Sequence, residues 1–279
     1  MSTPDHRGAA SIIKTRGFAP PAPSKSMAAL PHLRETLPQS RNGKGQGDKM
    51  IEQVFMRGDG LDALRIMLGL ASLAAAIAYQ VVERQPPSTL RTTLKTLAIG
   101  LLVPLPLLLL GAPGAAALPL VLLALAFLLS SLGDLFLALK GDARNFMRGL
   151  VAFLVSHLFY ISVMVPLASS PETLPAKAAS LFVGLGAIAL YLSLAPALGR
   201  MKLPFGAYLV AILVMALSAL AIPAGQPWLG LGAVLFVLSD SVIALDKFRG
   251  PIPYRGLIVW STYYVGQAMM ALSLLALLA

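Results

Sequence analysis

The sequence has no cysteine and few charged residues for its length. Charged side chains make up 12% of the 279 residues, whereas a soluble domain carries about 25%. Without cysteine, the chain has no disulfide, iron–sulfur cluster or thiolate zinc site. Only His157 of the three histidines lies in an apolar run, so one protomer's membrane domain lacks three histidine ligands for a metal. We therefore expect no metal site and no cofactor.

Apolar residues are correspondingly abundant, at 57% of the chain. They gather in runs near 20 residues long, the length at which an α-helix crosses a bilayer, and they lack the alternation of a membrane β-strand. The predicted fold is an all-α integral membrane protein with eight transmembrane helices. Their expected ranges are about 61–82, 93–111, 115–139, 146–168, 177–195, 204–222, 227–247 and 256–278. Pro104 and Pro106 predict a kink in the second helix.

The first 58 residues are rich in proline, serine, glycine and basic residues, without a sustained apolar period. This composition predicts a disordered tail at 1–58 before a single membrane domain at 59–279. The tail lacks the apolar core and cleavage site of a secretory signal. Met50 opens a plausible alternative start.

The basic residues predict the orientation in the membrane. The net charge of +10 does not indicate nucleic-acid binding, because lysine and arginine collect in the cytoplasmic loops of membrane proteins. Connections after the even-numbered runs carry only Lys177, and those after the odd-numbered runs carry Arg84, Arg91, Lys95, Lys140, Arg144, Arg148, Arg200, Lys202, Lys247, Arg249 and Arg255. We expect the second group in the cytoplasm and both termini outside, although the basic tail opposes this. If the source is bacterial, the membrane is the plasma membrane.

Two aspartates, Asp134 and Asp240, lie inside apolar runs. A carboxylate at the bilayer centre costs about 2.5–3.5 kcal/mol, which makes each a functional-site hypothesis. The segment LGDLFLAL around Asp134 matches LSDSVIAL around Asp240, at 240 − 134 = 106 residues. Two other matches have nearly the same offset, Arg148 with Arg255 (255 − 148 = 107) and Lys95 with Lys202 (202 − 95 = 107). Together they predict a parallel tandem repeat of four helices plus four.

Spacing from the basic residues gives the depth of each polar side chain. At 1.5 Å per residue, Asp134, Asp240 and Tyr208 lie roughly 10 Å below the cytoplasmic edge. His157 and Gln267 lie deeper, at about 13–18 Å. We expect all five side chains to line one cavity open toward the cytoplasm.

Structural interpretations remain for each of these residues. Asp134 can accept hydrogen bonds from nearby serines, and Asp240 can pair with Lys95 or Lys202 to hold helices together. A single buried histidine such as His157 is more often an interhelical donor than a catalyst. Most membrane tyrosines serve packing or the interface, and we apply this to Tyr160, Tyr263 and Tyr264. Two aspartates at matched depth favour the functional interpretation.

At these residues the chain resembles a known family. SSLGDLFLAL, FMRGLVAFLVSHLFY and LFVLSDSVIALDKFRGPIPYRGLIVWSTYYVGQ are similar to segments of the YhhN-like lysoplasmalogenases, which include bacterial and animal proteins. The resemblance covers about residues 61–278. It implies an eight-helix membrane enzyme that hydrolyses the vinyl ether bond of lysoplasmalogens, giving a fatty aldehyde and glycerophospho-ethanolamine or -choline. The family's signature residues match Asp134, Asp240, His157, Lys95 and Tyr208.

Vinyl ether cleavage needs an acid to protonate carbon and a carboxylate to stabilise the resulting oxocarbenium ion and deprotonate water. We expect Asp134 and Asp240 to share these roles, as paired carboxylates do in glycosidases. His157 is the third expected catalytic residue. The expected substrate contacts are Lys95, Tyr208, Ser239, Tyr264 and Gln267. Lys95 would attract the lipid phosphate, with Lys202 and Lys247 as further candidates. The family's glutamine usually follows alanine, whereas Gly266 precedes Gln267 here.

Two other functions remain open from the residues. Intramembrane carboxylates and parallel repeats are also typical of a small-molecule or proton-coupled transporter. A metal-dependent lipid hydrolase of the alkaline ceramidase type conflicts with the single intramembrane histidine. Because many bacteria make no plasmalogens, a related ether lysolipid is an alternative substrate. The expected partners are a membrane lysolipid and the bilayer, without nucleic acid, and the sequence predicts no oligomeric state.

Overall fold

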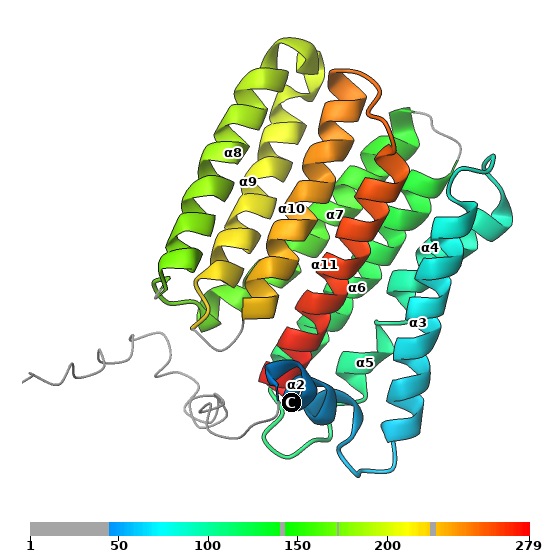
Figure 1. The fold of residues 1–279 in the computed structure, drawn as a ribbon, viewed down its shortest axis with the longest axis vertical. Coiled ribbons are helices and arrows are strands. Elements are labelled where there is room, and N and C mark those ends of the chain that lie inside the picture. The colour runs from blue at the N-terminus through cyan, green and yellow to red at the C-terminus, as the bar shows by residue number, and fades with distance from the viewer. Residues whose placement is uncertain (1–44, 140–142, 172, 224–226) are drawn as a thin grey trace, which may run out of the picture.

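The protein is a bundle of long, roughly parallel and antiparallel helices (Figure 1). The computed structural model describes residues 45–139, 143–171, 173–223 and 227–279. These residues form helices and turns but no strand, which confirms the expected all-α fold. The elements are α2 (Gln46–Phe55), α3 (Asp62–Val82), α4 (Thr89–Gly100), α5 (Pro104–Leu107), α6 (Ala117–Ala138), α7 (Ala143–Met164), η2 (Val165–Leu167), α8 (Leu174–Leu198), η3 (Gly199–Met201), α9 (Lys202–Leu220), α10 (Pro227–Phe248) and α11 (Arg255–Leu278).

Seven stretches of the described residues are long and apolar enough to cross a membrane. The longest, Leu174–Leu220, has 47 residues. As one helix it would measure about 70 Å, roughly twice the hydrocarbon thickness of a bilayer. The chain instead reverses at Gly199, whose φ of 48° suits glycine, and α8 and α9 pack side by side. This stretch therefore supplies two crossings, and the expected eight helices are confirmed.

The second crossing is broken where the prolines predicted a kink. Helix α4 ends at Gly100, a turn follows, and α5 begins at Pro104. Pro104 and Pro106 have no backbone N–H and cannot continue the hydrogen-bond ladder of α4. The prediction of a local break in this helix is confirmed.

The two halves of the bundle repeat one packing order. In the first half α3 packs on α4, α4 on α6, and α6 on α7. In the second half α8 packs on α9, α9 on α10, and α10 on α11. Asp134 and Asp240 lie on the third long helix of their halves. This is the arrangement expected of a four-plus-four repeat.

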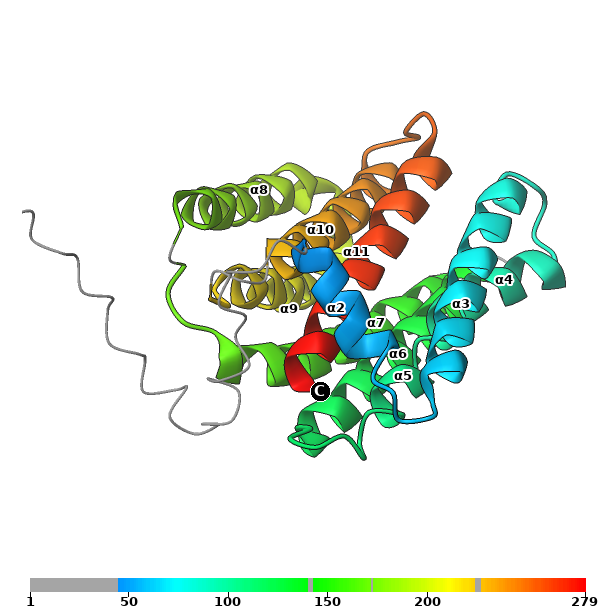
Figure 2. The same ribbon diagram turned by 60° about the horizontal axis from the view of Figure 1, so that its bottom comes forward.

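Helices α3, α6, α8 and α10 all end at the same end of the bundle, the upper end in Figure 1, and the helices that follow them begin there. We call this the basic end, because it carries the arginines and lysines of the odd-numbered connections. The C-terminus lies at the opposite end (Figures 1 and 2).

The described chain begins earlier than the expected tail boundary at residue 58. Residues 1–44 of that tail lie outside the described residues. Residues 46–55, however, form α2, which lies across the end of the bundle opposite the basic end (Figure 2) and packs on α11 and α3. Met50 and Val54 are one turn apart on the same face of α2, and both are buried. Burial of this apolar pair gives the segment a fixed structure that its polar composition does not predict.

Candidate active site

A cavity of about 330 Å³ opens among the helices at the basic end. This volume lies within the range of small-molecule sites, about 300–1,000 Å³. Charged side chains line its outer part, namely Glu83, Arg91, Asp246, Lys247 and Arg255. Its inner part is lined by the polar groups Lys95, Asp134, Tyr208, Asp240 and Tyr263, together with aromatic rings such as Phe153 and Trp260. Both intramembrane aspartates therefore face one space.

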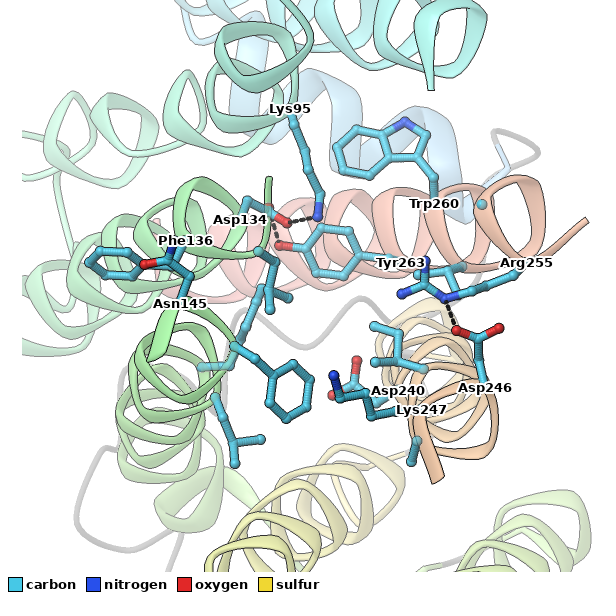
Figure 3. Close-up of a pocket in the computed structure, with 18 of the residues that line it drawn as sticks. Lys95, Asp134, Phe136, Asn145, Asp240, Asp246, Lys247, Arg255, Trp260 and Tyr263 are labelled. Atoms are coloured by element: carbon cyan, nitrogen blue, oxygen red, sulfur yellow. Dashed lines mark hydrogen bonds and ion pairs between the residues drawn. The ribbon is translucent and has the colours of Figure 1, made fainter. Parts of the chain in front are cut away.

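Asp134, on α6, is 2% exposed and has a separate donor for each carboxylate oxygen. The Nζ atom of Lys95 lies 3.3 Å from Oδ1. The hydroxyl of Tyr263 donates to Oδ2 at 2.7 Å. Figure 3 shows Lys95 from α4 and Tyr263 from α11 converging on Asp134. The lysine supplies the positive charge that a buried carboxylate needs.

Asp240, on α10, is partly exposed and has different partners. The Tyr208 hydroxyl donates a hydrogen bond to Oδ2. Ser239 Oγ lies 3.2 Å from Oδ1 and donates to the carbonyl oxygen of Phe236 at 2.8 Å. No cation in the described part of the chain forms an ion pair with Asp240. Its immediate partners are neutral hydroxyls.

Gln267 and His157 form a layer beneath the cavity. Each follows a cavity-lining residue by four positions, Gln267 after Tyr263 and His157 after Phe153, and so lies about 6 Å deeper. Both side chains are fully buried. Gln267 accepts from the Tyr160 hydroxyl at 2.6 Å and donates to Ser130 Oγ at 3.1 Å. Neither Gln267 nor His157 lines the cavity.

The imidazole of His157 supports the cavity from behind. Its Nδ1 pairs with the carbonyl oxygen of Phe153. Its ring packs edge-on against Tyr208 and Phe236, with centroid distances of 5.2 and 5.1 Å. His157 therefore reaches Asp240 only through Tyr208, the phenol that donates to that aspartate.

The structure brings together part of the residue set expected from the sequence. Asp134, Asp240, Lys95 and Tyr208 line the cavity. Ser239 contacts Asp240, and Tyr264 turns away, its hydroxyl 2.9 Å from Ser72 Oγ on α3. The expectation that His157 and Gln267 share the lining is not met, because they lie one turn below it.

Tyr263 and Trp260 line the cavity but were not expected there. Tyr263 was expected to serve packing, and no role was predicted for Trp260. Helical spacing contains a signal for both, because Trp260, Tyr263 and Gln267 share one face of α11 at intervals of three and four residues. Tyr264, three residues before Gln267, lies near the same face by spacing, and the structure shows that Tyr263 is the tyrosine that lines the cavity.

Comparison with known proteins adds an independent observation. The YhhN family model matches residues 90–274. The chain belongs to the YhhN family. The matched residues include the four expected residues that line the cavity, together with Tyr263 and Trp260. Within this YhhN-family protein, α3 and the residue that caps it lie outside the match but add Tyr79 and Glu83 to the same cavity.

The relatives come from animals and bacteria. Human "Lysoplasmalogenase TMEM86A" is 38% identical over 154 residues, covering 52% of this chain and 61% of the relative. "Lysoplasmalogenase TMEM86B" from Sus scrofa is 34% identical over 150 residues, covering 53% and 61%. "Lysoplasmalogenase" from Mycobacterium tuberculosis (strain CDC 1551 / Oshkosh) is 31% identical over 150 residues, covering 52% and 57%. The chain thus spans about three fifths of the relatives' length, and no solved structure matches it.

Family membership and eight apolar crossings establish this YhhN-family protein as an integral, multi-pass membrane protein. The cavity lies at one end of the bundle, where polar headgroups meet the hydrocarbon region of a bilayer.

Proposed function

We propose that this protein is a lysoplasmalogenase. It hydrolyses the vinyl ether bond of a lysoplasmalogen, or of a related ether lysolipid, to a fatty aldehyde and a glycerophospho-ethanolamine or -choline. The names of its YhhN relatives support this activity. The observation that carries the proposal is that Asp134 and Asp240 line one cavity at the basic end.

Two carboxylates match the demands of this reaction. Protonation of the β-carbon of a vinyl ether produces an oxocarbenium ion, water adds to it, and the hemiacetal collapses to aldehyde and alcohol. One group must hold a proton to give, and another must be negative to stabilise the cation and accept a proton from water. Glycosidases meet a related oxocarbenium problem with a carboxylate pair. Asp134 and Asp240 supply this pair here.

The rim of the cavity suits a phosphate headgroup. Lys95 directs its ammonium to Asp134, so the phosphate is assigned to other cations. Lys247 holds its Nζ 5.0 Å from the ring centre of Phe146, and no carboxylate among the described residues pairs with it. Arg91 has a buried Nε without a partner in the described part of the chain. These two cations form the proposed phosphate site.

The apolar part of the lining accommodates the start of the alkenyl chain. Phe153 and Trp260 lie beside the aspartates, and other apolar side chains complete the walls, including Leu137, Leu150, Phe205, Ile243 and Val259. The vinyl ether joins headgroup and chain, so a lysolipid with its phosphate at the rim places this bond near the carboxylates. His157 and Gln267 lie beneath the cavity and support the carboxylates rather than contact the substrate. Tyr208 supports Asp240 and also faces the cavity.

The transporter alternative fits this geometry less well. A carrier needs access to its carboxylates from both sides of the membrane. Here both aspartates face one cavity at the basic end, and the layer beneath it, formed by His157, Tyr160 and Gln267, is fully buried. A site that opens at one end of the bundle favours hydrolysis over transport.

A metal-dependent hydrolase also lacks support. Within the described ranges, no three His, Asp or Glu side chains are placed to hold a metal ion. The proposed steps use proton transfer between carboxylates, substrate and water. We therefore assign no step to a metal.

The decisive experiment compares Asp134→Asn and Asp240→Asn with the wild-type protein in aldehyde release from lysoplasmenylethanolamine. Loss of a general acid or base lowers turnover by about 10²–10⁴-fold, so we expect at least a hundredfold fall for each. Asp246→Asn is the matched control, because Asp246 pairs with Arg255 at the rim, and we expect less than a tenfold change. Near-normal release from either test variant, once its insertion is verified, contradicts the two-carboxylate mechanism.

A further inference from the structure

The two aspartates of the cavity differ in the charge of their partners. Asp134 has one charged partner, the ammonium of Lys95, and one neutral donor, the hydroxyl of Tyr263. Asp240 contacts two neutral hydroxyls, those of Tyr208 and Ser239. A carboxylate removed from water needs a cation or several donors to remain ionised. Only Asp134 has the cation.

The hydroxyl of Ser239 compensates a negative charge on Asp240 only weakly. A serine hydroxyl has one hydrogen to donate. Ser239 directs it to the carbonyl oxygen of Phe236, at 2.8 Å, and lies further from Asp240 Oδ1, at 3.2 Å. A hydrogen that two acceptors share stabilises an ionised Asp240 less than an undivided donor would.

The other charged groups near Asp240 agree with this arrangement. Lys95 and Asp134, the closest charged side chains of α4 and α6, pair with each other and nearly cancel at a distance. On α10 the next cation, Lys247, lies seven residues further along, about 10 Å toward the rim. From α9 and α7 the neutral Tyr208 and, behind it, the imidazole of His157 face this site. Among the described residues, no cation forms an ion pair with Asp240.

Accessibility separates the two groups as well. Asp240 is partly exposed toward the cavity, whereas Asp134 is 2% exposed and held from two sides by Lys95 and Tyr263. The group that protonates carbon must touch the alkenyl chain, while the group that accepts a proton from water needs only a water-sized gap. Position and partners thus lead to the same assignment.

We propose that Asp240 is the acid that protonates the vinyl ether carbon and that Asp134, ion-paired with Lys95, is the carboxylate that stabilises the cation and activates water. This assignment rests on the proposed lysoplasmalogenase function. Lys95 is then a positioning residue of the catalytic pair and not the phosphate ligand.

The proton transfers balance over one cycle. The Asp240 proton moves to the β-carbon, the carbon–carbon π pair forms the new C–H bond, and the ether oxygen shares the positive charge. Water adds to the α-carbon while Asp134 takes its proton, giving a hemiacetal. Asp134 returns that proton to the ether oxygen as the C–O bond breaks, and the hemiacetal hydroxyl gives its proton to Asp240. Aldehyde and alcohol leave, and both aspartates regain their starting states.

Infrared spectroscopy tests the assignment without an activity assay. A protonated carboxyl has a carbonyl stretch that is distinct from ionised carboxylate bands and shifts in D₂O. At neutral pH we expect a buried protonated carboxyl in the wild-type protein and in Asp134→Asn, and its loss in Asp240→Asn. Lys95→Met should add a second such band, because Asp134 loses its cation. Absence of the band from the wild type, or its loss in Asp134→Asn with retention in Asp240→Asn, overturns the proposal.

Chemical rescue tests the same assignment in turnover. Formate is ionised at neutral pH and can replace a missing carboxylate base but not a missing acid. We expect formate to raise aldehyde release by Asp134→Ala at least tenfold and to leave Asp240→Ala unchanged, and the opposite pattern reverses the roles. If the wild-type protein cleaves no vinyl ether lysolipid, the proposed function fails, while the infrared bands still decide which aspartate is protonated.

Discussion

Two adjacent tyrosines on α11 have separate tasks. Tyr263 donates its hydroxyl to Asp134 inside the cavity, and its ring packs against Phe153, Phe236 and Trp260. Tyr263→Phe keeps the ring and removes only the donor. A hydrogen bond to a charged group is worth about 1.5–3 kcal/mol, so we expect kcat for aldehyde release to fall roughly tenfold to a hundredfold, with KM nearly unchanged.

Tyr264→Phe is the matched control for this change. Its hydroxyl lies against Ser72 on α3 and does not line the cavity. We expect turnover close to that of the wild type. If the two phenylalanine variants lose activity equally, Tyr263 has no special part in the chemistry.

Substitution of two lysines tests whether the lipid phosphate binds at the cavity rim or is attracted by any basic residue at this end of the bundle. Lys247 lines the cavity, whereas Lys202 lies at a separate, mainly apolar groove lined by α7, α8 and α9. Lys247→Ala removes a cation from the proposed phosphate site, and we expect KM for the lysolipid to rise about tenfold, the equivalent of roughly 1.4 kcal/mol. Lys202→Ala should leave KM within twofold. The measurement is the rate of aldehyde release as a function of lysolipid concentration. An equal change of KM in the two variants would contradict a phosphate site at Lys247.

Helices α10 and α11 cross with their backbones nearly in contact. A Cβ atom built at Gly266 would lie 2.7 Å from the carbonyl oxygen of Gly232 and 3.1 Å from the backbone nitrogen of Phe236. Backbone atoms cannot rotate aside, so Gly266→Ala must push the helices apart. Overpacking of this kind costs about 1–3 kcal/mol, and we expect a lower midpoint of thermal unfolding in detergent.

Gly186→Ala provides the control for added helix propensity. Gly186 lies on α8, where an added Cβ meets no atom within 4 Å, and alanine favours a helix over glycine by up to about 1 kcal/mol. We expect an unchanged or slightly higher midpoint. A fall as large as that of Gly266→Ala would show that alanine is harmful at both sites for reasons other than the crossing.

Much of the fold was predictable because its signals are local. Apolar run length set the crossings, and Pro104 and Pro106 set the break between α4 and α5. Helix α2 was missed because only tertiary contact with α11 and α3 distinguishes its apolar face from the surrounding polar tail. The boundaries that depend on neighbours were therefore the ones that sequence analysis did not predict.

The depth of the site residues along the helix axes was predictable, but the direction of each side chain about its helix axis was not. Counting residues from the basic rim placed Asp134, Asp240 and Tyr208 at one level, and all three line the cavity. A residue count does not fix the angle of a helix about its axis, and one residue turns the direction by about 100°. For this reason the sequence did not predict that Tyr263 rather than Tyr264 faces the cavity. It also did not predict the ion pair between Lys95 and Asp134, which the structure shows.

At the scale of the whole molecule, the charge distribution and the cavity share one end. Most of the described arginines and lysines lie near the end where α3, α6, α8 and α10 end, and the cavity opens there. Basic connections of membrane proteins remain in the cytoplasm. We therefore expect the enzyme to take its lysolipid from the cytoplasmic leaflet, with α2 and the C-terminus at the opposite face.

The absence of native cysteine allows a clean test of this orientation. Gln85 lies in the exposed connection between α3 and α4 at the basic end, and Ser170 is exposed in the connection between α7 and α8 at the other end. A membrane-impermeant maleimide applied to intact cells should label Ser170→Cys and should label Gln85→Cys only after permeabilisation. The reverse pattern would place the cavity on the outer face. In that case the substrate pool, and the compartment that receives the aldehyde, would change sides with it.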